Sequence, residues 1–197
     1  MPRHPDPELE ERILQAADVL WRRGGERALT MRAVAQAART NTPAVYRRFK
    51  DRQDLLRGLL LRIAGRIRER FQQGQTIEEM ALAYVESALQ TPHEYLLFYS
   101  NAHAMSPPKG KRGARPIRES RPNFALVEQL LARQLGGLPE EHTQLALELW
   151  ALLHGTTMLL LSKSIPQGHE DELRAACRAA VNALVGKAAQ QRVPSKL

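Results

Sequence analysis

The sequence has little of what disulfide-bonded, secreted or membrane proteins depend on. Cys177 is the one cysteine among 197 residues, so no disulfide can form within the chain. The first residues include no apolar run that could serve as a secretory signal. Residues 145–161 are the most apolar stretch, but Glu148 and His154 lie in it, and their charge would be costly in lipid. We therefore expect a protein of the reducing cytoplasm with no membrane partner, in which this stretch is a buried helix.

The sequence also lacks the motifs of common catalytic and metal sites. It contains no Gly-x-Ser-x-Gly, no glycine-rich phosphate loop and no His-x-x-x-His. Its six histidines lie at least ten residues apart, without the spacing of metal ligands. Cys177 lies on the apolar face of a predicted helix, which favours a place in the core. The sequence thus predicts no enzyme, no metal site and no cofactor.

Strand signals are almost absent, and apolar residues recur every three or four positions, which predicts an all-α fold. The first helix is expected to have Asp6 as its N-cap and to end at Gly24-Gly25. The other expected helices are 30–38, 42–49, one from Asp51 onward, 76–90, 93–104, 122–136, 139–164 and 169–189. We place a domain boundary inside the helix that begins at Asp51, which gives an N-terminal domain of 1–55 and a C-terminal helical bundle of 56–197. Residues 106–122, rich in Pro, Gly and Arg, are expected to form a loop that is a lid, an arm near DNA or a disordered segment.

Positive charge is concentrated in the first third of the chain. Residues 1–73 hold 16 Lys+Arg and 9 Asp+Glu, a net of +7, out of a total net charge of +8. Residues 27–52 carry seven basic side chains against one acid, Asp51. A basic run is commonly a solvated face, but this one coincides with two short helices joined by a tight turn. That combination favours contact with the phosphates of nucleic acid.

The short helix at 42–49 has one inward and one outward face. At about 100° per residue, Val45 and Phe49 share a face and should point into the core. Pro43 and Arg47 then point outward, flanked by Ala44 and Tyr46. Small residues at the start of such a helix allow close approach to base edges, and Arg47 can form two hydrogen bonds with guanine. The segment therefore predicts a helix-turn-helix that places this helix in the major groove.

Four further residues are candidates for holding the phosphate strand. Arg48 should point sideways from the recognition helix, and Thr30 and Arg32 begin the preceding helix, where backbone N–H groups favour anions. Arg52 begins the next helix and could contact a phosphate in the same way. The alternative is that all of these are surface residues of an ordinary three-helix unit.

Residues 8–56 resemble the N-terminal domain of TetR-type transcriptional regulators. The resemblance rests on residues in register with the family pattern: Thr30, Ala35, Ala38, Val45, Tyr46, Phe49, Arg52, Leu55 and Leu56. The chain has Arg39 where the family usually has Gly, and Thr40 where an aliphatic residue is usual. Arg52 replaces a common Lys, and Pro43 a common Gly. The resemblance implies DNA-contact roles for Arg32, Thr42, Pro43, Ala44, Tyr46, Arg47, Arg48 and Arg52.

A second resemblance lies near the C-terminus. Trp150, His154 and Gly155 are similar to the Trp…His-Gly motif of one C-terminal domain type of this family, called WHG. This implies a helical domain that forms dimers and senses an effector. A tentative ligand pocket comprises Tyr95, Phe98, Tyr99, Trp150, His154 and Thr157, with Thr156 as a further polar group. The alternative is that these aromatic residues and His154 simply belong to the core.

The last helix has an apolar stripe of Leu173, Ala176, Cys177, Ala180, Val181 and Leu184. Paired with helix 139–164, it would suit a two-fold four-helix interface, although packing within one chain is the alternative. The residues together predict a homodimeric, ligand-responsive repressor of a palindromic double-stranded DNA operator, released by an unknown small-molecule effector. A helical small-molecule binding protein and a constitutive, nonspecific DNA binder are the competing hypotheses.

Overall fold

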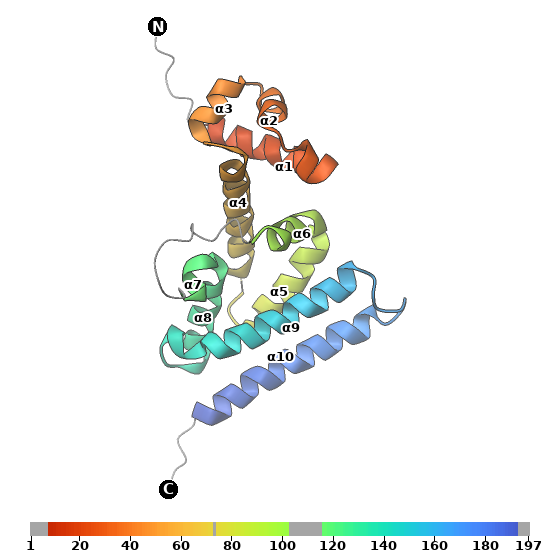
Figure 1. Cartoon of the computed structure of the whole chain (residues 1–197). Coiled ribbons are helices and arrows are strands. Elements are labelled where there is room, and N and C mark those ends of the chain that lie inside the picture. The colour runs from red at the N-terminus through yellow and green to blue at the C-terminus, as the bar shows by residue number, and fades with distance from the viewer. Residues whose placement is uncertain (1–7, 73, 103–115, 193–197) are drawn as a thin grey trace. The chain divides into compact units, whose positions relative to one another are not determined.

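The computed structural model describes residues 8–72, 74–102 and 116–192, and the regular elements among them are all helical (Figure 1). The all-α prediction is confirmed. The predicted N-cap at Asp6 and residues 106–115 of the predicted loop lie outside the described residues, whereas Ile117–Ser120 of that loop form a short helix. The chain divides into two compact units, one from the described residues within Met1–Ile63 and Leu97–Pro108, the other from those within Ala64–Leu96 and Lys109–Leu197.

The first unit is built on α1 (Leu9–Ala28), α2 (Met31–Ala37), α3 (Thr42–Arg48) and the beginning of α4 (Arg52–Gln72). Its short helices begin where the sequence provides caps. Thr30 Oγ1 accepts a hydrogen bond from the Ala33 N–H at 3.2 Å, as predicted for an N-cap. Asn41 caps α3 in the same way, a role that the sequence analysis did not assign to it.

The glycine pair predicted to end the first helix does break it. Gly25 has φ 59° and ψ −148°, so regular helix stops there, and one more helical turn leads on to Ala28. Few residues other than glycine adopt this backbone conformation. Leu29 and Val34, on either side of the start of α2, are both fully buried.

The core of the first unit includes Ile13, Ala17, Leu29, Val34, Val45, Leu55, Leu59 and Leu60, each fully buried. Gly58 allows α4 to approach the recognition helix closely. A Cβ at this position would lie 2.8 Å from Cε1 of Phe49 and 3.2 Å from Cδ2 of Leu14. The contact fixes Phe49, and with it the end of α3, against α4.

The turn between α2 and α3 is a Schellman motif with an arginine at the left-handed position. The Thr40 N–H donates to the Ala35 carbonyl at 2.9 Å, and the Arg39 N–H donates to the Gln36 carbonyl at 3.1 Å. Arg39 has φ 52°, a conformation that suits glycine, the residue usual in the TetR pattern. The turn therefore has the Schellman geometry although the Cβ of Arg39 makes the left-handed conformation strained.

Replacing Arg39 by glycine should stabilise the first unit by about 0.5–1 kcal/mol, because relief of left-handed strain outweighs the added freedom of the unfolded chain. Denaturant unfolding followed by Trp21 fluorescence measures the change. Arg39→Ala keeps the Cβ and should leave stability within about 0.5 kcal/mol of the parent. Equal stability of the glycine and alanine variants would contradict the strain argument.

The second unit takes the rest of α4 and most of the later helices. These are α5 (Ile77–Gln90), α6 (Pro92–Ser100), α7 (Ile117–Ser120), α8 (Pro122–Leu135), the 3-10 helix η2 (Pro139–His142), α9 (Thr143–Leu161) and α10 (Glu170–Arg192). The residues of α6 from Leu97 onward belong to the first unit. A capping box of Thr76 and Glu79 starts α5.

The apolar helix α9 packs on α5 and on α10, and Figure 1 shows α9 and α10 side by side. Residues Pro139–Leu161 form a helical segment long and apolar enough to cross a membrane by length and composition alone. Within the second unit, however, Leu149, Leu153 and Thr157 of this helix are almost fully buried. The segment is a partly buried core helix, in line with the prediction.

Three arginines of α4 are engaged by side chains of other helices in the same unit. Arg62 forms an ion pair with Glu11 at 2.5 Å within the first unit, and Arg66 pairs with Glu94 at 2.9 Å within the second. Arg70 donates a hydrogen bond to the Ser87 hydroxyl. These three side chains are therefore not simply solvated, because acids and a hydroxyl from other parts of the chain lie against them.

Candidate nucleic-acid interface

The recognition helix α3 is anchored by its inner face. Asn41 Oδ1 accepts a hydrogen bond from the Ala44 N–H at 2.9 Å, and Pro43 lies in the first turn, where its missing N–H costs nothing. Val45 is fully buried and Phe49 is 5% exposed. The predicted inward face is thus confirmed, and the buried face fixes the orientation of the outer one.

The outer face of α3 presents Pro43, Tyr46 and Arg47, all exposed, with Tyr46 at 51%. Among the described residues, no ion pair or hydrogen bond engages the Arg47 guanidinium. Five N–H donors therefore remain available for an acceptor outside the chain. Ala44 does not share this face: it is 4% exposed, so the prediction that its side chain points outward was wrong. The tight packing of α3 on the core covers its small side chain.

The candidate phosphate-binding residues lie around α3 and the start of α2. Thr30, Arg32 and Arg48 are exposed, and Thr42 is half-buried. The Thr30 hydroxyl oxygen accepts from the cap N–H and still has a proton to donate. No partner among the described residues holds Arg32. These residues fit a positively charged surface that could contact a phosphate strand.

Arg52 has an internal role that its sequence position does not reveal. Its Nε donates to the Leu29 carbonyl at 2.9 Å, and its terminal nitrogen donates to the Glu26 carbonyl at 2.9 Å. The same nitrogen lies 2.9 Å from the Glu26 carboxylate. These carbonyls belong to the end of α1, where helical N–H partners are missing. The side chain, 42% exposed, therefore holds the α1–α2 corner to the start of α4, whether or not it also meets DNA.

Replacing Arg52 by glutamine should destabilise the first unit by about 1–2 kcal/mol, because two charge-assisted hydrogen bonds to carbonyls are lost. Arg52→Lys should recover less than half of that loss, since an ammonium lacks the planar fork. Denaturant unfolding provides the measurement. Arg57→Gln, an exposed arginine of the same helix, is the matched control. If both glutamine variants are equally stable, Arg52 does not brace the corner.

The six tentative ligand residues are not gathered at one place within a single unit. Phe98 and Tyr99 belong to the first unit, where their rings meet edge to face at 5.3 Å between centroids. Tyr95, Trp150, His154 and Thr157 belong to the second unit. The structure brings together only part of the predicted set inside either unit.

Two tyrosines and His154 form a polar chain in the second unit. The Tyr95 hydroxyl lies 2.6 Å from His154 Nδ1 and 3.1 Å from the Tyr84 hydroxyl. Burial lowers the pKa of His154, which favours the neutral imidazole, and in one tautomer its Nδ1 accepts a hydrogen bond from the Tyr95 hydroxyl. Trp150 packs edge-on against Phe124 with centroids 6.2 Å apart. The buried hydroxyl of Thr157 has no hydrogen-bond partner in the part of the chain that the structure describes.

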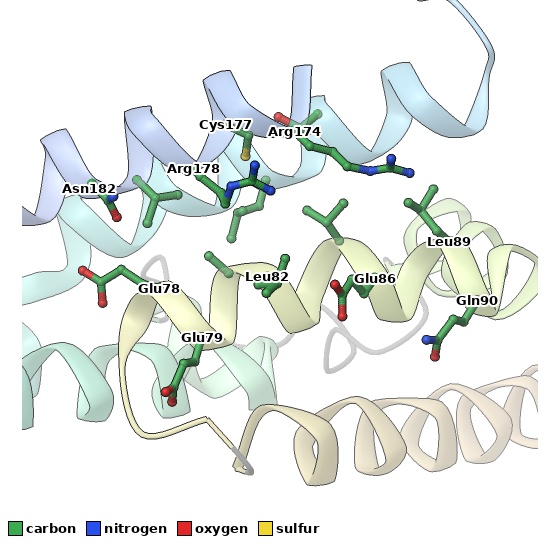
Figure 2. A pocket seen from close by; sticks show the side chains of 15 residues that line it. Glu78, Glu79, Leu82, Glu86, Leu89, Gln90, Arg174, Cys177, Arg178 and Asn182 are labelled. Atoms are coloured by element: carbon green, nitrogen blue, oxygen red, sulfur yellow. The ribbon is translucent and has the colours of Figure 1, made fainter. Parts of the chain in front are cut away.

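Two hollows of the second unit are lined by described residues, and none of the six tentative residues lines either. One, about 640 Å³, lies between α5, α9 and α10 (Figure 2). The sequence analysis missed it. In the sequence, the residues that line it form ordinary apolar stripes with charged flanks. Such a stripe does not indicate whether neighbouring helices pack tightly or leave a groove between them.

Comparison with known proteins identifies both parts of the chain. A family model for bacterial regulatory proteins of the tetR family matches residues 13–59, and one for the tetracyclin repressor-like C-terminal domain matches residues 77–184. A comparison with curated protein sequences finds no match.

Solved structures share the fold over nearly the whole chain. A TetR-family transcriptional regulator from Streptomyces coelicolor is 21% identical, with a TM-score of 0.63 over 92% of this chain and 99% of that one. The multidrug binding protein EbrR, complexed with imidazole, is 24% identical, with a TM-score of 0.65 over 93% of each chain. A TetR variant from Acinetobacter baumannii AYE, in complex with minocycline, is 18% identical, with a TM-score of 0.57 over 91% and 96%.

At identities below 25%, the solved structures show the fold alone. The family assignment rests on the two family models, which match the helix-turn-helix and the C-terminal bundle. The packed inner face of α3 and its exposed basic outer face lie inside the first match. Members of this family regulate transcription and are not enzymes. The chain therefore belongs to the TetR family of DNA-binding transcriptional regulators.

Proposed function

We propose that this regulator is a repressor that binds a palindromic operator as a homodimer and is released by a small molecule. Residues 1–55 would read DNA, and 56–197 would bind the effector and form the dimer. The observation that carries the proposal is the Arg47 guanidinium, which no described residue pairs with, beside exposed Tyr46 on a helix fixed by buried Val45 and Phe49. A rigid helix with free donors is what base recognition requires.

The DNA contacts divide by chemistry. Arg47 donates two hydrogen bonds to a guanine, and Pro43 lies against the base edges. The proposed phosphate contacts are Thr30, Arg32, Thr42, Tyr46 and Arg48. Ala44 contributes through its backbone, because its side chain is covered. Arg52 supports the surface from within through its bonds to Glu26 and Leu29.

The proposed dimer interface uses α9 and α10. On α10, the exposed alanines are Ala175, Ala176, Ala179, Ala183 and Ala189. On α9, Ala151 and Gly155 are exposed, as is Leu159 at 40%. Small side chains allow helices of two subunits to approach closely, and a two-fold interface yields two recognition helices for two half-sites.

The effector part of the proposal rests on the polar chain and on α4. Tyr95 and His154 offer hydrogen-bonding groups inside an aromatic environment, as a WHG-type sensor domain would need. Two of the similar structures are complexes with small molecules, EbrR with imidazole and the TetR variant with minocycline. Because α4 contributes residues to both units, a ligand-dependent shift in its arrangement would alter DNA binding by a population shift. The regulator would act in the cytoplasm.

Selection of duplexes from a random DNA pool tests the proposal. We expect enrichment of a palindrome whose half-sites lie about one helical turn apart, protected as one unit in footprinting by a species of twice the chain mass. A small-molecule screen against that complex should yield compounds that release it. Enrichment of no sequence would overturn operator recognition, and a monomer on a single half-site would overturn the dimer.

A further inference from the structure

The groove between α5, α9 and α10 lies wholly within the second unit and is separate from the six tentative effector residues. Its volume of about 640 Å³ falls within the range of small-molecule sites. Figure 2 shows α5 and α10 running alongside each other with side chains from both lining the space between them. From Leu82 to Leu89, α5 offers roughly 10 Å of wall.

The floor of the groove is apolar but holds one hydroxyl. Val85, Leu153, Cys177 and Val181 line it and are each less than 9% exposed. Thr156 also lines the groove and is 5% exposed, and no described residue hydrogen-bonds its hydroxyl. This hydroxyl is not among the fully buried polar atoms, so a ligand atom that enters the groove can reach it and form a hydrogen bond with it.

An exposed leucine extends this apolar surface to the mouth of the groove. Leu82 lines the groove and is 43% exposed, which is high for a large aliphatic side chain. Covering it would remove apolar area from water and favour binding of an apolar body. The floor and mouth together fit an elongated hydrocarbon.

Two of the three acidic side chains that line the groove are engaged. Glu78 accepts hydrogen bonds from the Gln134 side chain, and Glu79 belongs to the capping box of α5. In Figure 2, Glu79 projects from α5 on the side away from α10. Glu86, the third, is exposed to solvent.

The arginines of α10 have the opposite orientation. Figure 2 shows Arg174 and Arg178 in the space between α10 and α5. Arg174 forms an ion pair with Asp171 at 2.7 Å, whereas no described residue pairs with Arg178. An unpaired guanidinium beside an apolar floor favours a carboxylate, which it can bind through two charge-assisted hydrogen bonds.

We propose that this groove binds an amphipathic carboxylate, with its hydrocarbon chain on Leu82, Val85 and Val181 and its carboxylate on Arg178. The site goes beyond the proposed repressor function, because binding there requires neither DNA nor the Tyr95–His154 chain. It adds a ligand class, medium-chain carboxylic acids, that nothing in the DNA-reading unit implies.

Calorimetric titration of the full chain, without DNA, tests this site with three probes of equal chain length: decanoate, decanol and decylamine. We expect decanoate to bind, and to bind at least about tenfold more tightly than decanol, the margin of one charged hydrogen-bonded pair. Decylamine should bind more weakly still, because its ammonium meets Arg174 and Arg178.

Two matched pairs of variants locate the site. Arg178→Gln should weaken decanoate binding by about tenfold or more, whereas Arg133→Gln, an exposed arginine of α8, should not. Leu82→Glu should abolish decanoate binding by placing a like charge in the groove, whereas Leu96→Glu, at an exposed leucine of α6, should not. All four replaced side chains are exposed, so the fold should persist, and thermal unfolding checks this.

Several outcomes would overturn the inference. These are no binding of decanoate, tighter binding of decylamine, or decanoate binding that Leu82→Glu leaves unchanged. If a second copy of the chain fills the groove instead, decanoate should not bind, and Leu82→Glu should disrupt the dimer. Since no operator enters the titration, the result stands apart from the test of DNA recognition.

Discussion

Replacing Tyr46 and Arg47 together by alanine should lower affinity for the selected operator by about 100-fold, since the loss of one bidentate base contact and one phosphate contact amounts to roughly 3 kcal/mol. Both side chains are exposed, and Val45 and Phe49 hold the helix from the other face. The variant should therefore fold as the parent does. Fluorescence anisotropy with the selected duplex measures the loss.

Two further variants separate base reading from simple charge. Arg32→Ala should weaken binding to all duplexes alike and reduce the salt slope by about one. Arg133→Ala, an exposed arginine of the second unit, should change neither affinity nor slope. If the Tyr46/Arg47 double variant binds the operator as the parent does, α3 is not the recognition helix.

Replacing Arg118 by methionine should destabilise the second unit by about 3 kcal/mol, because it leaves Glu128 buried without a counter-charge. Glu128 is 1% exposed, and the Arg118 guanidinium lies 3.3 Å from its carboxylate. The Thr143 hydroxyl donates to the same carboxylate at 2.6 Å, and Arg118 also pairs with Glu140. The network joins α7, α8, η2 and the first residue of α9.

Urea unfolding followed by Trp150 fluorescence in a Trp21→Phe background measures that loss within the second unit. The double variant Arg118→Met/Glu128→Leu should recover most of it, since an apolar pair no longer holds an uncompensated charge. Arg133→Met, on the exposed side of α8, serves as the control. A loss below about 1 kcal/mol, the usual limit for an exposed ion pair, would contradict the buried network.

The sequence predicted well where the evidence is local. The helices of the N-terminal unit follow from apolar spacing and from caps such as Thr30, whose bond spans three residues. The inward direction of Val45 and Phe49 follows from helix geometry alone. Ala44 shows the limit of that reasoning, because helical phase does not tell how closely the neighbouring surface approaches a small side chain.

The candidate site was likewise predictable from the sequence only in its local features. The sequence by itself determined an all-helical chain with a short basic helix after a tight turn, since periodicity, capping and charge act over a few residues. The TetR-type assignment rested instead on the resemblance of residues 8–56 to that family. Only the tertiary structure decided which charges are free. Arg52 is engaged by carbonyls 23 and 26 positions away, and Arg62 by an acid 51 positions away, while Arg47 remains available. The groove beside Arg178 likewise exists only where α5, α9 and α10 meet. Such pairings depend on the three-dimensional path of the chain, on which local sequence patterns carry no information.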